Sequence, residues 1–141
     1  MTRDAILDLI QRRQNAHDRR DALGVVNLYA ETCVAESPLA GGAVTGRAAN
    51  AEVLQALYRG FPDVKTTVEE TLIDGNRVAQ IGTMTGTDTG GFMGLPATGK
   101  PFRLPIVILC SVADGLIVHE RRIYDFTGML IQVGILKAKP V

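Results

Sequence analysis

The first half of the chain spaces its apolar side chains at helical intervals. A period of 3.6 residues predicts an amphipathic first helix whose apolar stripe consists of Ile6, Leu7, Leu9, Ile10 and Ala16. Four charged residues are expected off that stripe: Arg12, Arg13, Asp18 and Arg19. A second short helix over residues 21–30 has Asp21 as its predicted N-cap, and a third has Thr45 as its N-cap and ends before Pro62. Residues 32–39 between them are expected to be extended.

The second half changes to the alternating, β-branched pattern of strands. We expect strands over residues 64–73, 77–88, 102–113 and 116–125, tight turns at 74–76 and 114–115, and a glycine-rich loop over 89–100. Residues 127–136 are expected to form a short closing helix or a tail. Helices followed by a hairpin meander predict an α+β fold with the helices on one face of the sheet. Gly82 and Gly86, inside a strand, are expected to bend the sheet so that a pocket remains beside the helices.

Composition and charge narrow the class of protein. The 141 residues are expected to form one domain over 1–141, and 46% of them are apolar, which is too many for a disordered chain. Fifteen basic and fifteen acidic residues balance, so nothing favours binding to nucleic acid. The N-terminal residues carry charges where a signal peptide needs an apolar run, and no segment has the roughly 20 apolar residues of a membrane span. We therefore expect a cytoplasmic protein without a membrane partner.

The sequence gives little support for a metal site or a nucleotide site. The two cysteines lie far apart in the sequence and are expected to be buried apolar residues. His17 and His119 each lack a second ligand at the spacing of a zinc site, so no metal is expected. Residues 94–100 match the spacing of a phosphate-binding loop, but Pro101 and a strand follow where that motif needs Ser or Thr and a helix. We interpret this segment as a connector between strands.

Asp125 closes the last predicted strand and is the strongest candidate for chemistry. Alternation places it on one strand face together with Ile117, His119, Arg121 and Ile123. The aliphatic members indicate that this face points inward, where burial would raise the pKa of the Asp125 carboxyl and suit it to acid–base work. Two other interpretations stay open: Arg121 holds the carboxylate ionised in a structural ion pair, or Asp125 caps the helix expected over 127–136.

Further side chains are candidates for the wall of the pocket. Glu36 lies on the first extended segment and is either a second inner carboxylate or a solvated edge residue. Aromatic side chains on apolar helix faces belong to the core or meet a ligand at a cavity rim. The full set of predicted wall residues is Tyr29, Glu36, Tyr58, Phe61, Asp88, His119 and Ile123. No serine or cysteine stands in a nucleophile elbow, so hydrolysis through a covalent intermediate has no support.

Five segments share a recognisable arrangement of glycine, threonine and aspartate: residues 75–79, 85–90, 92–100, 114–118 and 125–134. Together they resemble the SnoaL-like polyketide cyclases of the nuclear transport factor 2-like superfamily. The resemblance implies a cone-shaped, strongly curved, mostly antiparallel sheet with three N-terminal helices that enclose a pocket. It also implies that Asp125 is the acid/base of an intramolecular aldol ring closure, without a metal or an organic cofactor. Residues 36–37, 87–89 and 120–121 depart from histidine-containing patterns of the family, which indicates a more polar pocket.

Three functions remain open. The first is a cofactor-free cyclase or isomerase-like enzyme for a small apolar or aromatic organic molecule, with Asp125 and Arg121 as its catalytic residues. The second is a hydrolase similar to limonene-epoxide hydrolase, in which Arg121, Asp125 and either Asp88 or Glu36 hold one water. The third is a ligand-binding or dimer-forming module without catalysis. In each case we expect a homodimer through the outer sheet face, because strand 102–112 is apolar on both faces.

Overall fold

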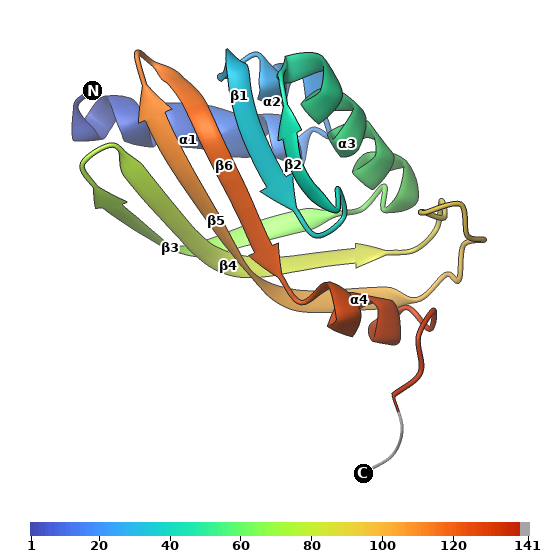
Figure 1. Ribbon diagram of the computed structural model, residues 1–141. Helices are drawn as coiled ribbons and strands as arrows, with labels where there is room; N and C mark the ends of the chain where they lie inside the picture. The colour runs from blue at the N-terminus through green and yellow to red at the C-terminus, as the bar shows by residue number, and fades with distance from the viewer. Residues whose placement is uncertain (139–141) are drawn as a thin grey trace.

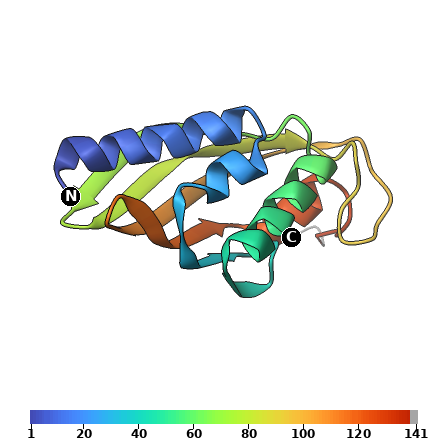
Figure 2. The ribbon, with the colours of Figure 1, turned by 90° about the horizontal axis from the view of Figure 1, so that it is seen from above.

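The computed structural model describes residues 1–138, in which helices cover one face of a curved sheet (Figures 1 and 2). The helices are α1 (Arg3–Asp18), α2 (Ala22–Val26), α3 (Arg47–Gly60) and α4 (Phe126–Gln132). The strands are β1 (Tyr29–Ser37), β2 (Gly42–Thr45), β3 (Lys65–Asp74), β4 (Arg77–Thr87), β5 (Pro101–Ala113) and β6 (Leu116–Tyr124). Seen from above, α1, α2 and α3 all lie over the sheet (Figure 2). The predicted α+β class is confirmed, and of the two alternatives for residues 127–136, a helix or a tail, the structure has the helix α4.

The sheet runs in the order β2-β1-β6-β5-β4-β3 and does not close on itself. Of its neighbouring pairs, β1 and β6 are parallel and the others are antiparallel. Strands β6 and β5 therefore form the centre, with β4 beside β5, and β1, which comes from the helical half of the chain, beside β6. The predicted curved and mostly antiparallel sheet is confirmed.

Three local expectations for the first half were wrong. The second helix ends at Val26 and β1 begins at Tyr29, so the chain is already extended where the helix was expected to continue. Strand β2 was not predicted. The third helix begins after Gly46, not after Thr45 as its cap, because the chain reverses there with a positive φ of 93° that glycine adopts without strain.

The concave face of the sheet and the apolar sides of the helices form the core. Phe61 is fully buried and packs against Phe92 and Phe102, with ring centroids 4.9 and 5.1 Å away. The prediction that Phe61 lines a pocket was wrong, because these rings fill the space around it. Among the described residues, no helix is long and apolar enough to cross a membrane.

The glycine-rich segment after β4 closes on Asp88 and leaves no cradle for phosphate. The buried Asp88 carboxylate accepts hydrogen bonds from the Gly91 and Thr98 backbone amides, at 3.2 and 3.1 Å, and from the Thr98 hydroxyl at 3.1 Å. Asp88 thus ties the two ends of this loop together. Its predicted place in a pocket wall was wrong, since loop amides occupy its carboxylate.

Candidate functional site

Strand β6 changes the face it presents to the core part-way along its length. Its pairing with β5 shifts between Ser111↔His119 and Val112↔Ile117, so β6 holds one extra residue at this bulge. Ile117 and Glu120, three residues apart, are consequently both fully buried. Beyond the bulge, the side chains that the simple alternation assigned to the interior point outward instead.

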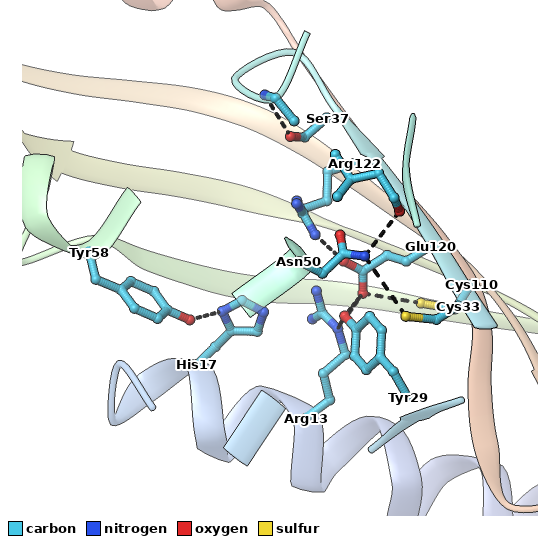
Figure 3. A network of polar contacts seen from close by, with 12 residues as sticks. Arg13, His17, Tyr29, Cys33, Ser37, Asn50, Tyr58, Cys110, Glu120 and Arg122 are labelled. Atoms are coloured by element: carbon cyan, nitrogen blue, oxygen red, sulfur yellow. Dashed lines mark hydrogen bonds and ion pairs between the residues drawn. The ribbon is translucent and has the colours of Figure 1, made fainter. Parts of the chain in front are cut away.

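Glu120 is the centre of a buried polar network (Figure 3). Its Oε1 accepts hydrogen bonds from Arg13 Nε at 2.5 Å, from the Tyr29 hydroxyl and from Cys110 Sγ at 3.7 Å. Its Oε2 accepts from Arg122 Nη1. The side chains of Arg13 and Glu120 are 1% and 0% exposed, and that of Arg122 is 10% exposed. Two guanidinium groups from α1 and β6 therefore share one carboxylate away from solvent.

Burial and the neighbouring charges fix the protonation state of each group in this network. Burial opposes the ionised form of Glu120, but the charges of Arg13 and Arg122 outweigh it and hold the pKa of the carboxyl well below its usual range. Burial likewise raises the pKa of Tyr29 and of Cys110, which stay protonated. Glu120 is thus a permanent anion that positions the two arginines, and it has no proton to exchange near neutral pH.

Arg13 belongs to the buried side of α1, contrary to the expectation that it lies off the apolar stripe. It follows Ile6 by seven residues, which is almost two helical turns, so the two side chains share a face. The buried residues of α1 are Ile6, Leu9, Ile10, Arg13 and Ala16. A charged residue in register with an apolar stripe was the sequence signal for this site.

One turn further along α1, His17 meets Tyr58 of α3. The Tyr58 hydroxyl lies 2.5 Å from His17 Nδ1. Burial raises the pKa of Tyr58 to about 12, and burial together with the Arg13 charge lowers the pKa of His17 well below its usual value, so both are neutral near pH 7. We assign the hydrogen bond as Tyr58 O–H to Nδ1, because this arrangement satisfies both groups. The proton of His17 then sits on Nε2.

Arg13, His17 and Tyr58 line a partly open cavity of about 40 Å³. The other lining residues are Gln14, Asp18, Leu57, Val64, Lys65, Thr66, Met84, Ile106, Ile108 and Arg122. This volume holds about three water molecules or the functional group of a larger molecule. Tyr58 and Leu57 at its edge are half-buried.

Polar atoms without partners are concentrated in this cavity. Among the described residues, four inaccessible side-chain nitrogen or oxygen atoms make no hydrogen bond: Arg13 Nη2, Gln14 Oε1, His17 Nε2 and Gln80 Oε1. Three of these atoms belong to residues that line the cavity. An unsatisfied buried polar group costs roughly 1–3 kcal/mol, and more when it is charged. Two donors and one acceptor without protein partners therefore belong to residues around this cavity.

Five predicted site residues, on β1, on β6 and just after β6, lie outside this cavity. Asp125 is exposed and is the N-cap of α4, where it accepts a hydrogen bond from the Gly128 amide at 2.9 Å. Ile123 is 45% exposed. On the same outer surface Glu36 lies 3.0 Å from His119 and 4.0 Å from Arg121. The expectation that this row points inward was wrong, because the β6 bulge reverses the alternation before it.

Two predicted residues do meet the cavity or its network. Tyr58 lines the cavity, and the buried Tyr29 donates to Glu120. Arg13, His17, Glu120 and Arg122 were missed as site residues. Within the described residues, no group of three or more His, Cys, Asp or Glu side chains is arranged to hold a metal ion.

The capping role of Asp125 gives a test. Replacing Asp125 by Ala is expected to destabilise the protein by about 1 kcal/mol, because the helix loses its cap, whereas Asn caps equally well and should cost little. Urea unfolding of both variants measures the difference. A large loss of stability in the Asn variant would show that Asp125 has a role that needs its charge.

The fold and this site can be compared with known proteins. The family model of the SnoaL-like polyketide cyclases matches residues 7–133. The chain is 30% identical to IdmH, a candidate polyketide cyclase from Streptomyces antibioticus, over 92% of this chain and 98% of that one, with a TM-score of 0.77. No curated protein matches the sequence.

Two more distant structures share the fold. AclR, a candidate hydroxylase from Streptomyces galilaeus, is 24% identical and has a TM-score of 0.84, covering 99% of this chain and 87% of that one. A SnoaL-like protein from Jannaschia sp. CCS1 is 20% identical, with a TM-score of 0.82 over 97% of this chain and 94% of that one. Since the family model spans nearly all of its helices and strands, the chain belongs to the SnoaL-like polyketide cyclase family.

Proposed function

We propose that the protein binds a small organic molecule in the cavity between α1, α3 and the sheet, and promotes cofactor-independent cyclisation or isomerisation through an enolate. The observation that carries this proposal is the pair of unpartnered donors, Arg13 Nη2 and His17 Nε2, beside one cavity. They lie four residues apart on one face of α1. Leu57, Met84 and Ile106 supply apolar surface next to them.

A substrate carbonyl oxygen would accept hydrogen bonds from both donors. When the neighbouring C–H loses its proton, negative charge develops on that oxygen, and fixed donors in a dry site stabilise it more than water does. A neutral His17 can fill this role, because the hydrogen bond from Tyr58 to Nδ1 leaves its proton on Nε2. Tyr58 is then a positioning residue that fixes the imidazole ring through Nδ1.

The reaction also needs a group that moves the C–H proton while the carbon–carbon bond forms. Asp18 is the carboxylate among the residues that line the cavity, and its Oδ1 accepts from Gln14 Nε2 at 3.0 Å. In the proposed reaction Asp18 takes the C–H proton, and the enolate carbon attacks a second carbonyl of the same molecule. The resulting alkoxide takes the proton back from Asp18, so a carbon–carbon bond forms without any oxidant or cofactor.

Epoxide hydrolysis is supported less well. That reaction needs two carboxylates and an arginine around one water. Asp88 is used by its own loop and Asp125 caps α4. Glu36, the other predicted third member, lies 4.0 Å from Arg121, but both are on the outer surface and away from the cavity. The inner network has one carboxylate, Glu120, and three strong donors already occupy it.

Hydrogen–deuterium exchange at the α-carbons of cyclopentanone tests the enolate proposal. This ketone is small enough to probe the cavity, and exchange in D2O is followed by NMR without knowledge of the natural substrate. We expect the protein to accelerate exchange over buffer, and His17→Phe to lose about 100-fold of that acceleration, as removal of one oxyanion donor does.

The matched control is His119→Phe, on the outer surface, which should exchange cyclopentanone as fast as the parent protein. A cyclopentanone exchange rate equal to that of buffer would exclude enolate catalysis and leave the binding-only function. An unchanged cyclopentanone exchange rate in His17→Phe would show that the catalytic site does not lie beside α1.

We also propose a homodimer through the outer face of the sheet. Large apolar side chains are exposed there, including Leu72 at 52% and Ile123 at 45%, and Ile81 and Val107 border a shallow hollow on the same face. Sedimentation equilibrium should give twice the mass of the chain, and Ile123→Glu should shift it to the monomer, since a charge would be buried without a partner. A monomeric parent protein at micromolar concentration contradicts this proposal.

A further inference from the structure

The buried network beside the cavity carries more positive than negative charge. Arg13 and Arg122 contribute two positive charges, and Glu120 contributes the single negative one. The other titratable groups of the network add nothing, because burial keeps Tyr29, Tyr58 and Cys110 protonated and His17 is neutral. At the cavity edge, the positive charge of the exposed Lys65 and the negative charge of the exposed Asp18 cancel in this count. The interior therefore keeps an excess of one positive charge.

Glu120 cannot neutralise this excess. Arg13 Nε, Tyr29 and Cys110 already donate to its Oε1, and Arg122 donates to its Oε2. Arg13 presents Nε to Glu120, and its Nη2, which has no partner, remains for another acceptor. A neutral carbonyl would satisfy the hydrogen bonds of Arg13 but not its charge, whereas a carboxylate satisfies both.

We propose that the natural ligand is a carboxylate-bearing molecule with a carbonyl or hydroxyl oxygen in the 1,3-position to the carboxylate, as in a β-keto acid or its enol. The carboxylate takes Arg13 Nη2 in place of the carbonyl oxygen, and the neighbouring oxygen accepts from His17 Nε2 alone. This inference deepens the proposed function and rests on the same site, because it places the enolate oxygen next to the group that anchors the substrate.

Salicylate and salicylamide are the probes that separate charge from shape. Salicylate is a rigid, planar mimic of the enol of a β-keto acid, and salicylamide has nearly the same shape without the charge. Calorimetry in HEPES buffer should show that the parent protein binds salicylate at least about tenfold more tightly, as expected for a charge-assisted contact. Cyclopentanone, which is neutral, should be displaced by salicylate.

Two variants move this preference in opposite directions. Arg13→Met removes the anchor and should abolish the preference for salicylate. Glu120→Gln raises the excess charge and should widen the preference, a gain that a merely damaged fold does not produce. Arg12→Gln, on the exposed side of the same helix, is the control and should leave the ratio of affinities unchanged.

The outcomes distinguish this inference from the proposed function. Equal affinity of the parent protein for both probes overturns the inference and leaves the enolate site intact, as does a preference that persists in Arg13→Met. If neither probe binds and cyclopentanone exchange is not accelerated, both proposals fall. These comparisons within the parent protein stay decisive if Glu120→Gln does not fold.

Discussion

Replacing Glu120 by Gln is expected to lower the free energy of unfolding by about 3–5 kcal/mol. The substitution keeps the shape of the side chain but leaves Arg13 and Arg122 buried without a counter-charge. Removing one partner of a buried ion pair lowers stability by far more than the intact pair adds to it, because the remaining charges stay desolvated. Urea unfolding measures this loss directly.

Glu31→Gln is the matched control. Glu31 is 87% exposed and lies 4.0 Å from Arg47, so its replacement should change stability by less than about 1 kcal/mol. Equal effects of the two substitutions would show that solvent reaches Glu120 and that the network is not buried.

The same carboxylate makes stability depend on pH in a defined direction. The pKa of Glu120 is lower in the folded than in the unfolded protein, so its contribution is complete above the unfolded value of roughly 4.3 and is lost as the pH falls towards the folded value. The parent protein should lose stability below about pH 4.5 more steeply than Glu120→Gln.

Gly82→Ala is expected to cost about 2–3 kcal/mol. Gly82 lies opposite the irregularity in β3 between Val68 and Glu70, where a Cβ would come within 2.1 Å of the Thr67 carbonyl oxygen. Backbone atoms cannot step aside, so the alanine must open the β3–β4 pairing that lets the sheet bend. Thermal and urea unfolding measure the loss.

Gly86 on the same strand provides the comparison. A Cβ there would lie 2.8 Å from the edge of the Phe102 ring, a side-chain contact that a small shift of the ring relieves, whereas the Gly82 contact is with backbone. Gly86→Ala should therefore cost about 1 kcal/mol. If Gly82→Ala proves as mild as Gly86→Ala, the sheet tolerates a side chain at the bend and the glycine is not required there.

Much of the fold follows from local patterns. The long strands β4 and β5 alternate regularly, and residues 74–76 make a tight turn as their sequence predicts. Helix α1 shows the 3.6-residue period. In contrast, β2 is only four residues long and is stabilised by pairing with β1, which no local pattern reveals.

The candidate site could be predicted much less well, for two physical reasons. A single extra residue in β6 reverses every side chain beyond it, so a correct strand assignment still gave the wrong inner face for Asp125. The network also joins α1 to β6, whose residues Arg13 and Glu120 lie 107 positions apart. Their pairing depends on tertiary packing; the helical register of Arg13 with Ile6 was the one local signal, and the prediction placed Arg13 off the apolar stripe.

A crystal structure of the protein soaked with salicylate tests the location of the site most directly. We predict electron density for the ligand between α1 and the sheet, with a carboxylate oxygen within hydrogen-bond distance of Arg13 Nη2 and the phenolic oxygen beside His17 Nε2. Density on the outer surface next to Asp125, with the interior unchanged, would contradict the account.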